Sequence, residues 1–112
     1  MAKRLKRGDV IVVSVAGDYG KPRPAIIVQS DRLNENASVL VALLTTALVD
    51  TPFYRLKVEP TPENGLKLSS QIMVDKIMAY PREKCGPVIG FVDQATLIAL
   101  NNMLAVMVGI AD

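Results

Sequence analysis

The sequence predicts a mainly β fold, a small curled sheet or barrel, that ends in a single C-terminal helix. Several short β-branched segments come first and are separated by polar or proline-containing breaks. The one segment with a helical pattern comes last in the chain. No internal repeat, low-complexity segment or linker divides the 112 residues, half of which are hydrophobic. We therefore expect one domain over residues 1–112 with a core of its own.

Three segments in the N-terminal half have the composition of strands. Asp9–Val15 is short and β-branched, and Arg23–Gln29 follows the Gly- and Pro-containing loop Gly17–Pro22. Ser30–Ala37 is a polar connection. Ser38–Leu44 is a nearly continuous apolar run, which is typical of a central strand covered on both faces.

Three further strands are expected in the C-terminal half. Phe53–Val58 precedes Glu59–Gly65, which has the composition of a loop. Leu68–Ala79 alternates well enough to assign its residues to two faces, and Val88–Val92 is a short apolar piece.

One face of the segment Leu68–Ala79 is unusually polar. Alternation places Ser69, Gln71, Met73 and Asp75 on this face, and Ser70 on the other. A face that simply packs would not carry so many polar groups, so it is either a binding surface or a solvated strand face.

The terminal helix is predicted to begin after Asp93, which suits an N-cap, and to run to about Val108. Gly109 fits a helix stop. Apolar residues surround much of this helix, which indicates cover on more than one side. In so small a domain the second cover is expected to be another copy of the chain, a homodimer; the alternative is deep packing inside a folded sheet.

Charge and cysteine content exclude several classes of protein. The net charge is +2, and without Lys3, Arg4, Lys6 and Arg7 nine basic side chains face eleven acidic ones. Such a balance does not favour binding along double-stranded DNA. The single cysteine, Cys85, fits a reducing compartment. The apolar runs are too short or too polar for a membrane span, and no signal peptide is recognised, so we expect a cytoplasmic protein.

The available side chains also narrow the chemistry. The chain has no histidine and no clustered carboxylates, which makes a metal site improbable, and no glycine motif for a nucleotide cofactor. Internal transesterification of RNA remains possible: a 2′-hydroxyl attacks the neighbouring phosphorus, and the protein must stabilise charge on the phosphoryl oxygens. Arg23, held between Pro22 and Pro24, suits that task because its planar guanidinium pairs with two phosphate oxygens. Many inert loops contain such residues, so an ordinary structural loop is the alternative.

Four motifs in order give the chain a family resemblance. "KRGDVIVVSV", "KPRPAIIVQSD", "VALLTT" and "SSQIMVDKI" resemble the MazF/PemK toxins of bacterial toxin–antitoxin pairs, from Arg7 through the terminal helix. The resemblance implies a dimeric, SH3-like β-barrel of the type shared by MazF, Kid and the gyrase poisons. It also implies a sequence-specific, metal-independent endoribonuclease that cuts single-stranded RNA, largely messenger RNA, and that a cognate antitoxin neutralises.

The resemblance assigns roles to particular residues. Arg23 matches the family's catalytic arginine, Thr45 its catalytic threonine, and Asp75 an acidic position that some members use near the scissile phosphate. Thr46, beside Thr45, is a second candidate phosphate contact, and Lys21 a general attraction for RNA.

The remaining candidates concern the base and the substrate groove. Asp18 and Tyr19 stand where some relatives carry a histidine and a glutamate, and Met73 where some carry an arginine. The general base therefore stays open among Asp18, Tyr19 and Asp75. Ser69 and Gln71 are expected to line the RNA groove, with Gln71 as a candidate base reader.

Two alternatives keep the fold and change the function. A gyrase-directed toxin would depend on a tryptophan near the chain's end, and this sequence has no tryptophan. A non-catalytic binding module would keep the barrel and the antitoxin contact without turnover.

Overall fold

A computed structural model describes residues 5–14, 21–33 and 35–111 of the chain. Asp18 and Tyr19 lie outside these residues. The described part contains six strands, two short 3-10 segments and one α-helix. In chain order these are β1 (Asp9–Ser14), β2 (Pro22–Ile27), η1 (Asp31–Leu33), β3 (Ser38–Thr45), β4 (Arg55–Val58), β5 (Ser70–Pro81), η2 (Arg82–Lys84), β6 (Val88–Phe91) and α1 (Gln94–Met107).

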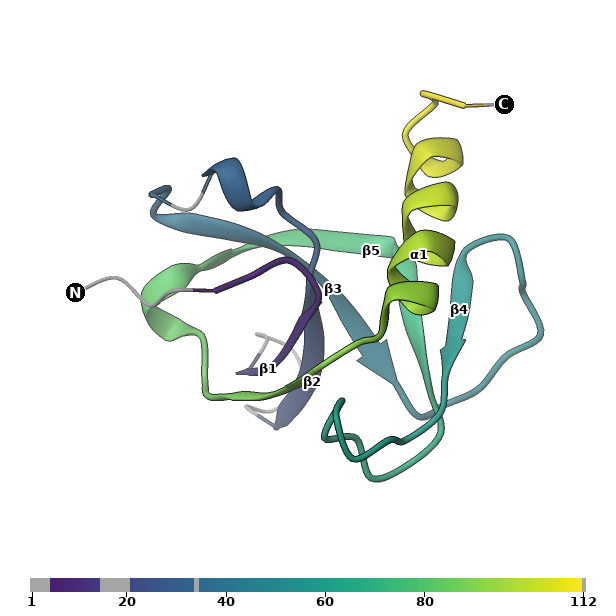
Figure 1. Cartoon of the computed structure of the whole chain (residues 1–112), viewed down its shortest axis with the longest axis horizontal. Coiled ribbons are helices and arrows are strands. Elements are labelled where there is room, and N and C mark those ends of the chain that lie inside the picture. The colour runs from purple at the N-terminus through teal and green to yellow at the C-terminus, as the bar shows by residue number, and fades with distance from the viewer. Residues whose placement is uncertain (1–4, 15–20, 34, 112) are drawn as a thin grey trace.

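All the described strands belong to one antiparallel sheet with the order β4-β5-β3-β2-β1-β6. The sheet curls into a half-barrel, and α1 stands beside its β4–β5 end (Figure 1). The loop between β4 and β5 reaches the far edge strand, where the Phe91 amide donates to the Glu63 carbonyl oxygen at 2.9 Å. The predicted combination of a β sheet with one terminal helix is confirmed.

Hydrophobic cores lie on both faces of the sheet. Alternate residues of β3 enter different clusters: Val41 and Leu43 join one, and Ala42 and Leu44 join the other. Because neighbouring residues of a strand point to opposite faces, β3 is buried from both sides. The prediction of a central strand that is covered on both faces is therefore confirmed for these four residues.

The helix begins and ends where the sequence predicts. The Asp93 carboxylate accepts a hydrogen bond from the Thr96 amide at 2.8 Å, which is an N-cap. Hydrogen bonds from the Thr96 side chain and backbone amide stabilise the ionised carboxylate and lower the pKa of Asp93. After the helix Gly109 has φ +81, a left-handed conformation that glycine adopts without strain.

One side of α1 packs on the sheet. Leu100 is fully buried, and Leu97 and Leu104 pack against the cluster that contains Leu44. Ile98 and Val106 remain exposed. The apolar circumference predicted from the sequence therefore divides into a buried side and a side open to solvent in the single chain.

Several predicted strand boundaries differ from the structure by one or more residues. The strand expected at Phe53–Val58 begins at Arg55, because the amides of Tyr54 and Arg55 both donate to the Thr51 carbonyl oxygen in a turn. The strand expected at Arg23–Gln29 covers Pro22–Ile27 instead, so Pro24 lies inside β2, opposite Val12 of β1.

None of the helices in the described ranges is both long enough and apolar enough to cross a bilayer.

Candidate active site

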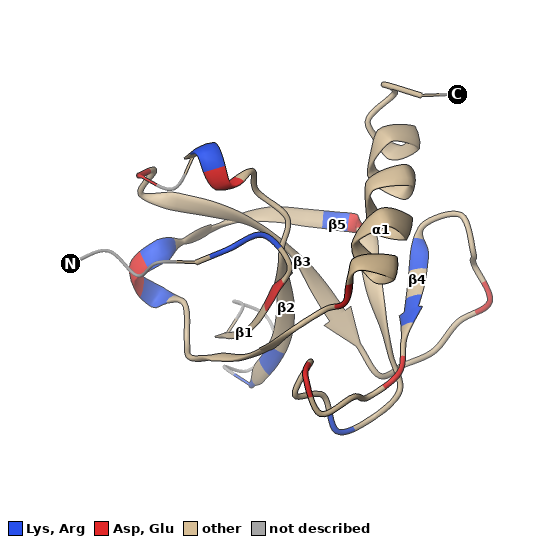
Figure 2. Cartoon of the chain, in the orientation of Figure 1, with Lys and Arg blue, Asp and Glu red and all other residues tan. Residues whose placement is uncertain are grey.

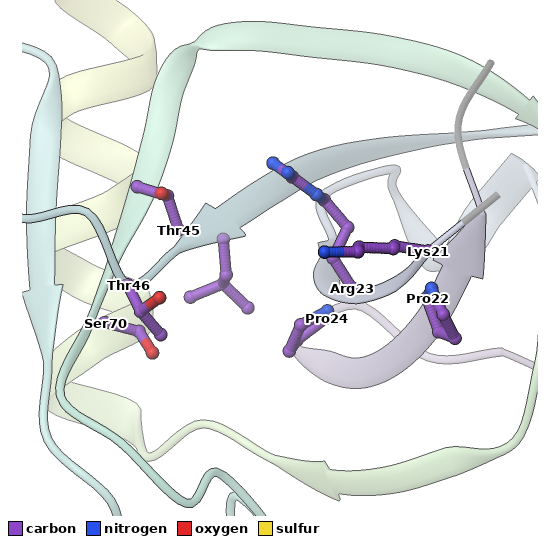
Figure 3. Close-up of a pocket in the computed structure, with 8 residues that line it drawn as sticks. Lys21, Pro22, Arg23, Pro24, Thr45, Thr46 and Ser70 are labelled. Carbon is purple, nitrogen blue, oxygen red and sulfur yellow. The ribbon is translucent and has the colours of Figure 1, made fainter. Parts of the chain in front are cut away.

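An open cavity of about 290 Å³ lies where β2 and β3 separate (Figure 3). Residues from three strands and their flanking loops line it. They are Lys21, Pro22, Arg23, Pro24, Leu44, Thr45, Thr46 and Ser70.

The prolines of β2 explain why the strands separate at this point. The β2–β3 ladder contains the pair Ala25–Leu43 and the two pairs beyond it toward the far end of β2. The Val28 amide donates to the Leu40 carbonyl oxygen at 3.0 Å, so even-numbered residues here direct their N–H groups toward β3. Pro22 and Pro24 are also even-numbered, but proline has no N–H to donate. The ladder therefore loses its donors toward β3 at the start of β2.

The interrupted ladder brings Arg23 and Thr45 across from each other. Continuing the register of Ala25 with Leu43 by two residues places Arg23 opposite Thr45. Arg23 is half-buried, whereas Lys21 is exposed. Both basic side chains extend into the opening, toward the side that carries Thr45 and Thr46 (Figure 3).

Three hydroxyl groups form the opposite side of the cavity. The Thr45 Oγ1 accepts the Ala47 amide at 3.1 Å, and the hydroxyl keeps its own proton for donation. The Ser70 Oγ donates to the Leu68 carbonyl oxygen at 2.9 Å. Thr46 lies between Thr45 and Ser70 on this wall (Figure 3).

The electrostatics of the cavity favour an anion. Among the described residues that line it, Lys21 and Arg23 are cationic and none is acidic. Basic residues are visible at the beginning of β2, where Lys and Arg are coloured blue (Figure 2). A guanidinium facing hydroxyl donors can bind the two oxygens of a phosphodiester.

Residues 6–108 match the family described as the PemK-like, MazF-like toxin of type II toxin–antitoxin systems. The chain belongs to this family. It is 38% identical to a probable endoribonuclease MazF of Mycolicibacterium smegmatis over 108 residues, 96% of this chain and 99% of that protein.

Solved structures of MazF-type toxins share the fold. A mycobacterial endoribonuclease in complex with its cognate antitoxin is similar with a TM-score of 0.80 and 25% identity, covering 96% of this chain and 98% of that one. A MazE–MazF structure from Deinococcus radiodurans is similar in fold with a TM-score of 0.79 at 14% identity, covering 97% of this chain and 99% of that one. The half-barrel with one helix is therefore a MazF-type fold, as the sequence resemblance implies.

Two of the candidate groove residues of this MazF-type chain make contacts elsewhere. The Ser69 hydroxyl donates to the Glu59 carboxylate, and this bond, followed by the contact with Lys57, lowers the pKa of Glu59. Gln71 is buried, and its amide holds one residue of the loop after β3: Nε2 donates to the Val49 carbonyl oxygen at 2.8 Å and Oε1 accepts the Val49 amide at 3.1 Å. Neither residue lines the cavity around Arg23.

Asp75 also lies apart from the cavity. Its carboxylate is 3.7 Å from Arg55 Nε and 3.8 Å from Lys76 Nζ. Asp75 lies four residue steps beyond Gln71, a distance of roughly 13 Å along β5. The structure thus brings Arg23, Thr45, Thr46 and Lys21 together and leaves Asp75 outside their cavity.

Ser70 is a polar lining residue that sequence reasoning missed. Alternation places it on the same face as Ile72 and Val74, which are core residues with Leu44. At Ser70, the first residue of β5, this face no longer contacts the core and lines the cavity instead. A single polar residue at the end of an apolar stripe is the signal that could have identified it.

Within the part of the chain that the structure describes, no group of three or more His, Cys, Asp or Glu side chains is placed to hold a metal ion.

Proposed function

We propose that this MazF-type endoribonuclease toxin cuts single-stranded RNA at specific sequences by internal transesterification in the cavity between β2 and β3, without a metal ion. The observation that carries the proposal is the meeting of Arg23 with Thr45 at the point where Pro22 and Pro24 interrupt the ladder. A rigid cation opposite a hydroxyl is the arrangement that an anionic phosphoryl group requires.

In this proposal the attacking group belongs to the substrate. The ribose 2′-oxygen attacks the adjacent phosphorus, the bond to the 5′-oxygen breaks, and a cyclic phosphate and a 5′-hydroxyl end result. Arg23 pairs with the phosphoryl oxygens as their charge increases, and Thr45 donates to one of them. Thr46 is the candidate second phosphate contact, and Lys21 draws the RNA toward the cavity.

We propose that the general base is one of the two candidates in the segment before Lys21. Asp75 contacts Arg55 and lines no part of the cavity, which argues against a role for it there. Of the three candidates from the sequence, Asp18 and Tyr19 remain. Both lie outside the described residues.

The decisive experiment compares two arginine variants. Purified Arg23→Ala should lose about 10²- to 10³-fold in cleavage rate on a long single-stranded RNA with chelator present, the typical effect of removing one transition-state donor. Arg32→Ala is the matched control, because Arg32 is an exposed arginine on η1. Equal cleavage by Arg23→Ala and wild type would overturn the assignment. Loss of wild-type cleavage in the chelator alone would overturn the metal-free reaction.

We also propose that the chain forms a homodimer and is neutralised by a cognate antitoxin. A structurally similar mycobacterial endoribonuclease is described in complex with its cognate antitoxin. The exposed apolar side chains of α1, among them Ile98 and Val106, support a second protein surface there. Sedimentation at low micromolar concentration tests the dimer, and a single species near the chain mass of 12.1 kDa would contradict it.

A further inference from the structure

We propose that an apolar hollow beside the Arg23 cavity is a nucleobase subsite, which binds the base of a nucleotide that flanks the scissile phosphate. The inference rests on the proposed ribonuclease function and adds where a base is held. The loop between β4 and β5, together with β6, builds the hollow.

The hollow is continuous with the cavity. Pro24, Thr46 and Ser70 line both of them, so an occupant of one touches the walls of the other. The volume of the hollow is about 230 Å³. This is below the 300–1,000 Å³ typical of pockets for drug-sized ligands, and it suits a single ring system better than a whole nucleotide.

The walls of the hollow have the chemistry of a surface for a base. Leu66, Leu68 and Ile89 provide aliphatic contact, and the Pro24 ring forms the side next to the phosphate cavity. Leu68 is 63% exposed and Ile89 37% exposed, although both are large apolar residues. Lys67 lies at the same hollow and adds a positive charge.

These exposed aliphatic groups would be removed from water when a base binds in the hollow. A nucleobase has an apolar face and a fixed covalent connection, through its ribose, to the phosphate beside it. An RNA whose phosphate binds at Arg23 therefore places a neighbouring base within reach of the hollow. The exposed lining surface of the hollow is almost entirely apolar, so we expect contact with the face of the base to contribute more than hydrogen bonds to its edge.

Glycine packing holds the loop that forms this wall. Gly65 has φ +70, and a Cβ on it would lie 2.2 Å from the Ile89 carbonyl oxygen. A Cβ on Gly90 would lie 2.3 Å from the Glu63 carbonyl oxygen. The two backbones thus touch without intervening side chains, and the loop is fixed against β6.

A buried asparagine stiffens the same loop. Asn64 is 3% exposed, and its Oδ1 accepts the amides of Thr61 at 3.0 Å and Leu66 at 2.9 Å. Its Nδ2 donates to the Glu59 carbonyl oxygen at 2.9 Å. A wall that is built before the ligand arrives loses little conformational entropy on binding, which is what a specific subsite requires.

The test is a two-by-two comparison of protein and RNA. One RNA contains a cut site that has been mapped with the wild-type protein. Its partners carry an abasic nucleotide on either side of the scissile phosphate. The protein is wild type or Leu68→Ser, and the measurement is kcat/KM for cleavage of each RNA.

We expect Leu68→Ser alone to lower kcat/KM on the intact RNA roughly tenfold. An abasic nucleotide at one of the two flanking positions should lower kcat/KM of the wild-type protein by a similar factor. The double change should cost no more than either one alone, because both remove the same contact. Leu33→Ser is the matched control: Leu33 is also a large exposed apolar residue, on η1, and its replacement should leave kcat/KM unchanged on every RNA. Ile89→Thr provides a second variant of the same wall and should repeat the result.

Losses that multiply in the double change would overturn the subsite, and so would an abasic RNA cleaved as fast as the intact one. Either result leaves the ribonuclease function standing. If wild-type protein cleaves no RNA, the proposed function fails. The subsite is then decided by fluorescence anisotropy of a bound single-stranded RNA in which each position in turn is made abasic, with wild-type protein and Leu68→Ser. Absence of both cleavage and binding would overturn both proposals.

Discussion

The buried amide of Gln71 provides a test of how the cavity is supported. Gln71→Leu keeps the approximate volume of the side chain and removes both hydrogen bonds to Val49. Because Val49 follows Thr45 and Thr46 along the chain, the change should loosen the loop that leaves the cavity. The alternative expectation from the sequence is that Gln71 reads a base of the RNA.

The size of the effect follows from the two bonds. Each hydrogen bond contributes about 1 kcal/mol net. Val49 is 44% exposed, so water can replace part of what is lost. We expect the free energy of unfolding to fall by about 1–2 kcal/mol, which for a chain of this size is roughly 4–8 °C in Tm.

Urea unfolding, amide hydrogen exchange and cleavage assays measure the three consequences. Exchange at the Val49 amide should accelerate more than exchange at core strand amides. The rate of RNA cleavage should fall less than about tenfold, since Arg23 and Thr45 remain, and the cut sequence should be unchanged.

Gln29 offers a matched control at the other end of β2. It is buried as well, and it bridges two backbone groups: Nε2 donates to the Leu33 carbonyl oxygen at 2.5 Å and Oε1 accepts the Leu40 amide at 3.3 Å. Gln29→Leu should therefore cost a similar stability and leave cleavage alone. A Gln71→Leu protein with wild-type stability, a protected Val49 amide and an altered cut sequence would refute the structural role of Gln71.

Three further predictions concern stability. Gly65→Ala should lower the free energy of unfolding by at least about 1–3 kcal/mol, because alanine is strained at positive φ and its Cβ meets a carbonyl oxygen of β6; urea denaturation measures this, and an unchanged midpoint would contradict it. Arg82→Met should lower the free energy of unfolding by about 2 kcal/mol, because the buried Arg82 donates to the backbone carbonyl oxygens of Asn36 and Leu33. Thermal melts that coincide with wild type would argue against a stabilising role for these bonds. Asp93 has a folded pKa below its usual 3.8, so its stabilising effect should be present above that value and be lost as the pH falls through the folded pKa. Comparing Tm against pH for wild type and Asp93→Asn, which keeps a capping oxygen without the charge, should show the difference between them shrink in acid, and parallel curves would contradict the assignment.

Local patterns were sufficient for the type and order of the described elements, though not for every strand boundary. β-branched segments indicate the strands, and Asp93 and Gly109 mark the ends of the helix, because these preferences act over a few neighbouring residues. The family resemblance singled out Arg23 and Thr45, and the structure brings them to one cavity. The catalytic roles of these two residues stay predictions.

Tertiary structure decided which polar side chains share the cavity. Alternation along β5 cannot show that Gln71 hydrogen-bonds to Val49, a loop residue more than twenty positions earlier. Nor can it show that Ser70 lines the cavity. The opening itself depends on strand register: Pro22 and Pro24 interrupt the ladder because their positions are the ones that should donate toward β3. Register and loop contacts join residues that are distant in sequence, so they depend on the packing of the whole sheet more than on any local pattern.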